Sequence, residues 1–108
     1  LIGQVGISQT DDDAEYELGY WIARKWQGQG FATEAVRAVL ETAAALGVPC
    51  VEAGHFLENP ASGRVLRKCG FVPTGKVIST KCAARGDMAL PAARYCRTLD
   101  TSMTKQVA

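Results

Sequence analysis

Hydrophobic and polar positions repeat with two different periods along this chain. Apolar residues recur at spacings of three and four over residues 32–46, which gives a single apolar stripe and predicts a helix. Gly47 follows as a helix stop, and Pro49 prevents continuation. A second helix is predicted from Asn59 to Gly70, because asparagine is a common N-cap and the proline after it suits the first helical position.

Segments rich in β-branched and aromatic residues predict strands at residues 1–7, 15–23, 48–56, 71–79 and 93–99. A turn-rich acidic stretch separates the first two and favours a hairpin. Residues 81–91 are ambiguous, and the residues after 100 are predicted to form a disordered tail. The expected fold is therefore an α/β mixed sheet with the order β-β-α-β-α-β-β, in one domain over residues 1–100.

Composition narrows the class of protein. The chain has 108 residues, 47% hydrophobic and 21% charged, which is typical of a soluble globular domain. A net charge of +1 gives no footprint for general nucleic-acid binding, and no apolar run approaches the roughly 20 residues that span a membrane. The four cysteines have no CxxC spacing and there is one histidine, so we expect free thiols in a cytoplasmic protein and no metal site.

The start of the chain is unusual. The strand pattern begins at Leu1, without an initiator methionine or a polar lead-in. We therefore expect the sequence to be a piece of a longer protein. The exposed strand at residues 1–7 also allows a homodimer formed by strand exchange.

The stretch QGQGFA, residues 27–32, stands between a predicted strand and the first predicted helix. Helix N-termini expose unpaired N–H groups, and glycines let a phosphate approach them closely. The lysine of a P-loop is absent, and Thr33 replaces the third glycine of the dinucleotide fingerprint. An ordinary turn and a phosphate cradle both fit this stretch alone.

Two motifs in this order resemble a known family. QGQGFA matches Q/R-x-x-G-x-G/A, the acetyl-coenzyme-A pyrophosphate loop of the GNAT N-acetyltransferases, and ELGYWIARKWQGQGFATEAV resembles the strand and helix around it. ENPASGRVLRKCGF resembles the N-x-x-S-x-x-x-L-x-K-x-G-F signature of the ribosomal-protein N-terminal (Rim-type) branch. The resemblance covers residues 1–71. A complete GNAT domain also has a first strand, two helices and another strand before the part that matches Leu1, and these elements form part of the acceptor site.

The resemblance implies an N-acetyltransferase that moves an acetyl group from acetyl-CoA to a primary amine by direct attack. A strand backbone would pair with the pantetheine arm, and an N–H near Ile22 would polarise the thioester carbonyl. That strand backbone belongs to Tyr20, Trp21, Ile22 and Ala23. The pyrophosphate would be held by N–H groups of Gln27, Gly28, Gln29, Gly30, Phe31 and Ala32.

The resemblance also implies roles for single side chains. Asn59 would lie beside the pantetheine, or serve as a helix cap alone. Ser62 would hydrogen-bond the coenzyme sulfur and assist departure of the thiolate, or be an ordinary surface serine. Many relatives carry a tyrosine acid where this chain has Leu66. Glu17 would act as the base, directly or through water, with Glu15 on the same strand face as the alternative.

Lys68 would meet coenzyme phosphates together with Arg64 and Arg67, which share its helical face by spacing, although such a run is also typical of a solvated surface. His55 is interpreted as a packed or exposed side chain. The acceptor stays open between a protein N-terminus, another peptide, an antibiotic amine and a polyamine. The alternative function is a coenzyme-A-binding module, or an incomplete fragment, without turnover.

Overall fold

The computed structural model describes residues 2–9, 15–82 and 85–99. The predicted tail lies outside these residues. Strands and helices follow the predicted order, and a short 3-10 helix between the second strand and the first helix is an addition. The elements are β1 (Gly3–Gln9), β2 (Tyr16–Ile22), η1 (Arg24–Trp26), α1 (Phe31–Ala45), β3 (Cys50–Phe56), α2 (Pro60–Lys68), β4 (Val72–Cys82) and β5 (Met88–Thr98).

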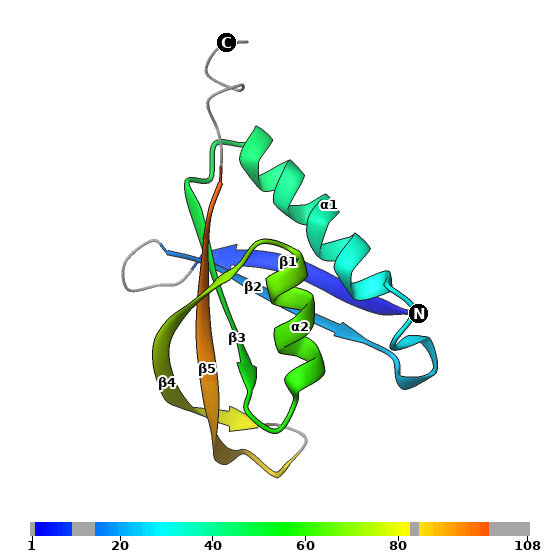
Figure 1. Cartoon of the computed structure of the whole chain (residues 1–108), viewed down its shortest axis with the longest axis vertical. Coiled ribbons are helices and arrows are strands. Elements are labelled where there is room, and N and C mark those ends of the chain that lie inside the picture. The colour runs from blue at the N-terminus through cyan, green and yellow to red at the C-terminus, as the bar shows by residue number, and fades with distance from the viewer. Residues whose placement is uncertain (1, 10–14, 83–84, 100–108) are drawn as a thin grey trace.

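The strands form one mixed sheet in the order β1-β2-β3-β5-β4. Antiparallel pairing joins β1 to β2, β3 to β5 and β4 to β5. The parallel pairing of β2 with β3 consists of one register pair, Glu17 with Glu52. Figure 1 shows β2 and β3 running apart toward their C-terminal ends. The sheet therefore opens into a wedge beyond Glu17.

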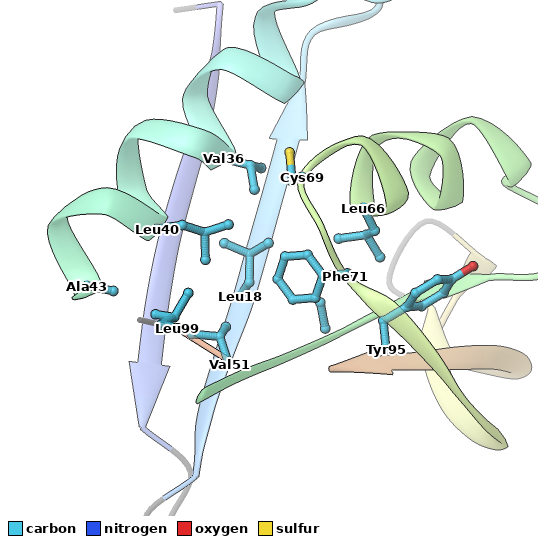
Figure 2. Close-up of a cluster of buried hydrophobic side chains, with 11 residues drawn as sticks. Leu18, Val36, Leu40, Ala43, Val51, Leu66, Cys69, Phe71, Tyr95 and Leu99 are labelled. Atoms are coloured by element: carbon cyan, nitrogen blue, oxygen red, sulfur yellow. The ribbon is translucent and has the colours of Figure 1, made fainter. Parts of the chain in front are cut away.

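Both helices pack on one face of this sheet, α1 against β1 and β2, and α2 against β3. Figure 2 shows the core between them, where side chains of helices and strands meet. Val36 of α1, Val51 of β3 and Leu66 of α2 are fully buried. Burying a side chain of this size stabilises a fold by roughly 1.5–3 kcal/mol. This core fixes the positions of α1 and α2 relative to the wedge.

The last hairpin is longer than the sequence predicts. β4 continues to Cys82 and β5 begins at Met88, so much of the ambiguous segment 81–91 is strand. Pro91 makes this segment a poor match to a strand pattern in the sequence, because proline has no N–H to donate to a strand ladder. The structure tolerates it with Ser79 as its register partner and with its carbonyl accepting from the Leu57 N–H at 3.1 Å.

Two other expectations concern the cysteines and the membrane. The four cysteines, which all lie within the described residues, are free thiols, as expected. Neither helix in the part of the chain that the structure describes has the length and apolar character needed to cross a membrane.

Candidate active site

A cleft of about 360 Å³ lies where β2, the glycine turn, the start of α1 and α2 come together. It gathers most of the residues that the sequence analysis assigns to a coenzyme. Those that line it are Tyr20, Trp21, Ile22, Gln27, Gly28, Gly30, Ala32, Asn59, Ser62 and Lys68. The glycine turn, which carries the first motif, therefore faces the start of α2, which carries the second motif, across this cleft.

The glycine turn is one wall of the cleft. Gly28 and Gly30 have positive φ angles of 77° and 83°, a conformation that other residues adopt at a cost. A Cβ at either position would meet no atom within 4 Å, so the space above the turn is open. Gly30 is the N-cap of α1 and brings no capping side chain, which leaves the first N–H groups of α1 available to a ligand.

The turn is tied back to the strand before it. The Gln27 side-chain amide donates to the Ile22 carbonyl at 2.9 Å. The Ala23 N–H donates to the Ile2 carbonyl at 2.7 Å, so it points toward β1 and away from the cleft. Since backbone groups of a strand alternate in direction, those of Tyr20 and Ile22 point the other way, into the wedge.

The first turn of α2 is the opposite wall. Asn59 is its N-cap residue but makes no side-chain capping hydrogen bond, so the structure does not bear out capping by this side chain. Ser62 follows in the first turn, and its Oγ lies 2.6 Å from the Tyr20 hydroxyl of β2. Burial raises the pKa of Tyr20 above its ordinary range, although the Ser62 hydrogen bond opposes this.

Two hydrogen bonds hold the walls together at the far end of α2. The Arg37 guanidinium of α1 donates to the Lys68 carbonyl at 3.1 Å. The Cys69 thiol donates to the Thr33 carbonyl at 3.6 Å. Burial raises the pKa of Cys69, with Arg37 and Arg97 lowering it in part. The cleft is therefore closed at one end by contacts between α1 and α2.

The basic residues of α2 point to different places. Arg64 and Lys68 line the cleft. Arg67 does not, because it donates to the Tyr95 hydroxyl at 3.2 Å, with its guanidinium 5.9 Å from the ring centroid. Arg67 therefore does not join Arg64 and Lys68 at the cleft. His55 is packed, with Nε2 3.2 Å from the Tyr95 hydroxyl, as the sequence analysis interprets it.

Glu17 lies apart from the cleft. It belongs to the register pair that joins β2 to β3. Its neighbour Leu18 is buried against the helices, so the Glu17 side chain points to the opposite face of the sheet. One carboxylate oxygen accepts from the Arg94 guanidinium at 2.7 Å, and the side chain is 38% exposed. The other predicted residues that do not line the cleft are Ala23, Gln29 and Phe31.

Some lining residues were not assigned by sequence. Arg64 was weighed without being assigned, and the others are Trp26, Thr33, Ala61 and Val65. Thr33 lies one helical turn after Gly30, and Ala61 and Val65 share the helical face of Arg64 and Lys68, so spacing could have found these three. Trp26 closes η1 and packs edge-on against Phe31 at 5.8 Å. No periodic signal in the sequence marks it.

Comparison with known proteins identifies the class. A family model described as an acetyltransferase (GNAT) domain matches residues 1–72. A probable N-acetyltransferase, YjcK of Bacillus subtilis, is 38% identical over 78 residues, which are 69% of this chain and 43% of that protein. The chain belongs to the GNAT acetyltransferase family.

Solved structures agree with this fold. A GNAT-family acetyltransferase from Bacillus anthracis superposes with a TM-score of 0.74 at 25% identity, covering 91% of this chain and 58% of that one. RimL, described as a ribosomal L7/L12 alpha-N-protein acetyltransferase in complex with coenzyme A, gives a TM-score of 0.69 at 25% identity. The alignment covers 81% of this chain and 49% of RimL. The chain thus spans about half the length of these relatives.

Proposed function

We propose that this chain binds acetyl-CoA in the cleft and belongs to an N-acetyltransferase that acts on a primary amine. The observation that carries the proposal is the cleft itself, in which the open glycine turn faces Ser62 of α2 across the wedge of the sheet. The coenzyme-A complex of RimL supports the choice of ligand, because that protein shares the fold.

The turn suits a pyrophosphate. Its glycines keep side chains out of the space above the first N–H groups of α1, and a helix N-terminus favours negative charge. Lys68 and Arg64 add positive side chains at the other wall. The backbone groups of Tyr20 and Ile22 point into the wedge, where they can pair with an extended pantetheine arm, and the Ile22 N–H can polarise the thioester carbonyl. Asn59 stands beside the path of that arm.

Two side chains serve the acyl transfer. Ser62 donates a hydrogen bond to the sulfur as the thiolate leaves. Glu17 takes the proton of the attacking amine, directly or through a water molecule. Because Glu17 is on the sheet face opposite the helices, the amine approaches from that face while the coenzyme enters from the helix side.

The first acceptor to test is a protein N-terminus. The description of RimL as an alpha-N-protein acetyltransferase supports it, and the Rim-type motif of α2 agrees. The other acceptors to test are small amines, including polyamines and amine antibiotics. A cytoplasmic location and a strand-exchanged homodimer stay predictions from the sequence; size-exclusion chromatography with light scattering tests the homodimer.

Calorimetric titration with acetyl-CoA tests the cleft, and a thiol-release assay across the amine panel tests turnover. We expect binding, and release of coenzyme A with at least one α-amine. Failure to bind at millimolar acetyl-CoA would overturn the proposal.

One observation favours a coenzyme-A-binding module without turnover as a second candidate. Arg94 already occupies one oxygen of Glu17, the proposed base. Glu17→Gln separates the two functions. For an enzyme, we expect kcat to fall by about 10²- to 10⁴-fold, the usual contribution of a general base, with an unchanged Kd for acetyl-CoA. Glu52→Gln, at the register partner on β3, is the matched control. Binding without any thiol release from the unmodified chain would favour the module.

A further inference from the structure

We propose that Tyr20 is a positioning residue for Ser62, holding the serine oxygen so that the serine proton points at the coenzyme sulfur. The proposal rests on the proposed function, since it concerns the same cleft. It assigns the hydroxyl of Tyr20 a role separate from that of its backbone.

The geometry of the pair carries the argument. The Tyr20 hydroxyl oxygen is 2.6 Å from Ser62 Oγ and 3.2 Å from the Ser62 carbonyl oxygen. Tyr20 and Ser62 both line the cleft, one from β2 and one from α2. The pair therefore bridges the two walls at the place where α2 begins.

Two arrangements of protons fit these distances. In the first, Tyr20 donates to the Ser62 carbonyl and the Ser62 hydroxyl donates to Tyr20. In the second, Tyr20 donates to Ser62 Oγ, and the serine proton is free to turn into the cleft, because hydroxyl protons rotate to suit their partners. Tyr20 is a donor in both. Negative charge in the cleft selects the second arrangement, in which a charged acceptor receives a stronger hydrogen bond.

The chemistry balances without ionising either hydroxyl. As the amine nitrogen bonds to the thioester carbonyl carbon, the C–S bond breaks and its electron pair goes to the sulfur. The Ser62 hydroxyl donates a hydrogen bond to that charge. The proton that the amine loses reaches the sulfur through solvent, so Ser62 and Tyr20 begin and end neutral. Burial, which raises the pKa of Tyr20, keeps this phenol protonated in alkaline solution, where thiolates form.

The test compares coenzyme A with desulfo-coenzyme A by calorimetry at pH 7 and pH 9. Free thiols ionise near pH 8.5, so the thiolate of coenzyme A becomes abundant between these two conditions. Among the residues that the structure describes, the charged or ionisable neighbours of the pair are Arg64 and Lys68 in the cleft and Cys69 behind it. Their contacts with phosphate are common to both ligands, and their attraction to the thiolate is the same in the unmodified chain and in the hydroxyl variants. Comparing the pH dependence of the affinity ratio between these proteins therefore isolates the hydroxyl contact with sulfur.

In the unmodified chain, we expect the preference for coenzyme A to rise by about tenfold from pH 7 to pH 9, close to the lower end of the range for a hydrogen bond to a charged group. Tyr20→Phe and Ser62→Ala should each remove most of that rise in the ratio of the two affinities. The double variant should match Ser62→Ala, because Tyr20 acts through Ser62. Tyr16→Phe is the matched control, since Tyr16 lies on the same strand face and packs against the core outside the cleft.

The outcomes separate the two proposals. A rise in Tyr20→Phe equal to that of the unmodified chain, or no rise in the unmodified chain, would overturn the role of Tyr20 while coenzyme binding stands. If neither ligand binds the unmodified chain, the proposed function fails and this inference fails with it.

Discussion

The two walls of the cleft offer a ligand different kinds of groups. The glycine turn and the start of α1 present backbone N–H groups, and their geometry depends on two positive φ angles. The α2 wall presents side chains, namely the Ser62 hydroxyl, the Asn59 amide and the cations Arg64 and Lys68. Sequence changes should therefore act differently on each wall.

The difference shows what each wall needs from the protein. The turn wall needs a backbone conformation, which glycine supplies without any side-chain chemistry. The α2 wall needs a helix held at the right place, because its side chains reach the ligand only if the helix stays packed. Leu66, on the buried side of α2, provides that packing in the core shown in Figure 2.

The largest effect should come from removing the anchor of α2. Leu66 is fully buried, so Leu66→Ala should lower the free energy of unfolding by about 2–5 kcal/mol. Urea unfolding followed by circular dichroism measures this loss. Leu57→Ala is the control, because Leu57 is 49% exposed and should change stability little. Equal losses in both variants would show that Leu66 does not anchor the helix.

The turn wall should respond to conformation rather than to steric clash. Gly28→Ala with Gly30→Ala adds methyl groups into open space, so the cost arises from the positive φ angles, about 1–2 kcal/mol each. The combined cost corresponds to roughly 30- to 1000-fold weaker acetyl-CoA binding if the bound state requires both angles. Calorimetric titration measures it.

The control for the turn is Gly19→Ala on β2. A Cβ there also meets open space, and Gly19 does not have a positive φ angle. This variant should bind acetyl-CoA as the unmodified chain does. Unchanged affinity in the double glycine variant would show that the phosphate cradle is assigned to the wrong turn.

The sequence predicted the order of elements because each local signal agreed with the fold. The apolar stripe of α1 and the Asn59-Pro60 start of α2 marked both helices within one or two residues. The last strand, β5, was harder to predict. Pro91 lies inside β5, and a strand tolerates a proline only where the ladder does not need its missing N–H, which depends on tertiary pairing.

The candidate site, like the fold, could be predicted from the sequence only in part. The glycine turn could be predicted, since positive φ angles restrict the choice of residue. The separate directions of Arg67 and Lys68 could not, because both residues lie one helical turn from Arg64, and the hydroxyl of Tyr95, distant in sequence, decides where Arg67 goes. The contact between Tyr20 and Ser62 spans β2 and α2, so local pattern carries no sign of it.

A smaller effect is expected from the cations of the α2 wall. Lys68 is exposed, so Lys68→Gln should weaken acetyl-CoA binding by at most about fivefold, the range of an exposed ion pair. The loss should shrink as salt is added, because screening weakens a charge contact that only the unmodified chain makes. Lys76→Gln, on exposed β4, is the control and should leave affinity unchanged. A loss that does not depend on salt would exclude a charge contact with phosphate.

The smallest effect concerns the junction between the walls, where Cys69 meets the Thr33 carbonyl. Burial raises the folded-state pKa of Cys69 above its unfolded value, so the fold favours the neutral thiol. This contribution to stability is complete below about pH 8.5 and is lost as pH rises through the folded-state pKa. Urea unfolding of the unmodified chain should therefore show falling stability above that pH.

Cys69→Ala tests the source of that fall. The variant should be less stable than the unmodified chain at pH 7, because a buried side chain is lost, but its stability should fall less between pH 7 and pH 10. Ionisation of Cys69 would place a thiolate against the Thr33 carbonyl, which loosens α2 from α1 while the turn keeps its own conformation. Acetyl-CoA affinity should then fall with pH less steeply in Cys69→Ala than in the unmodified chain, and parallel curves would place the pH dependence in another group.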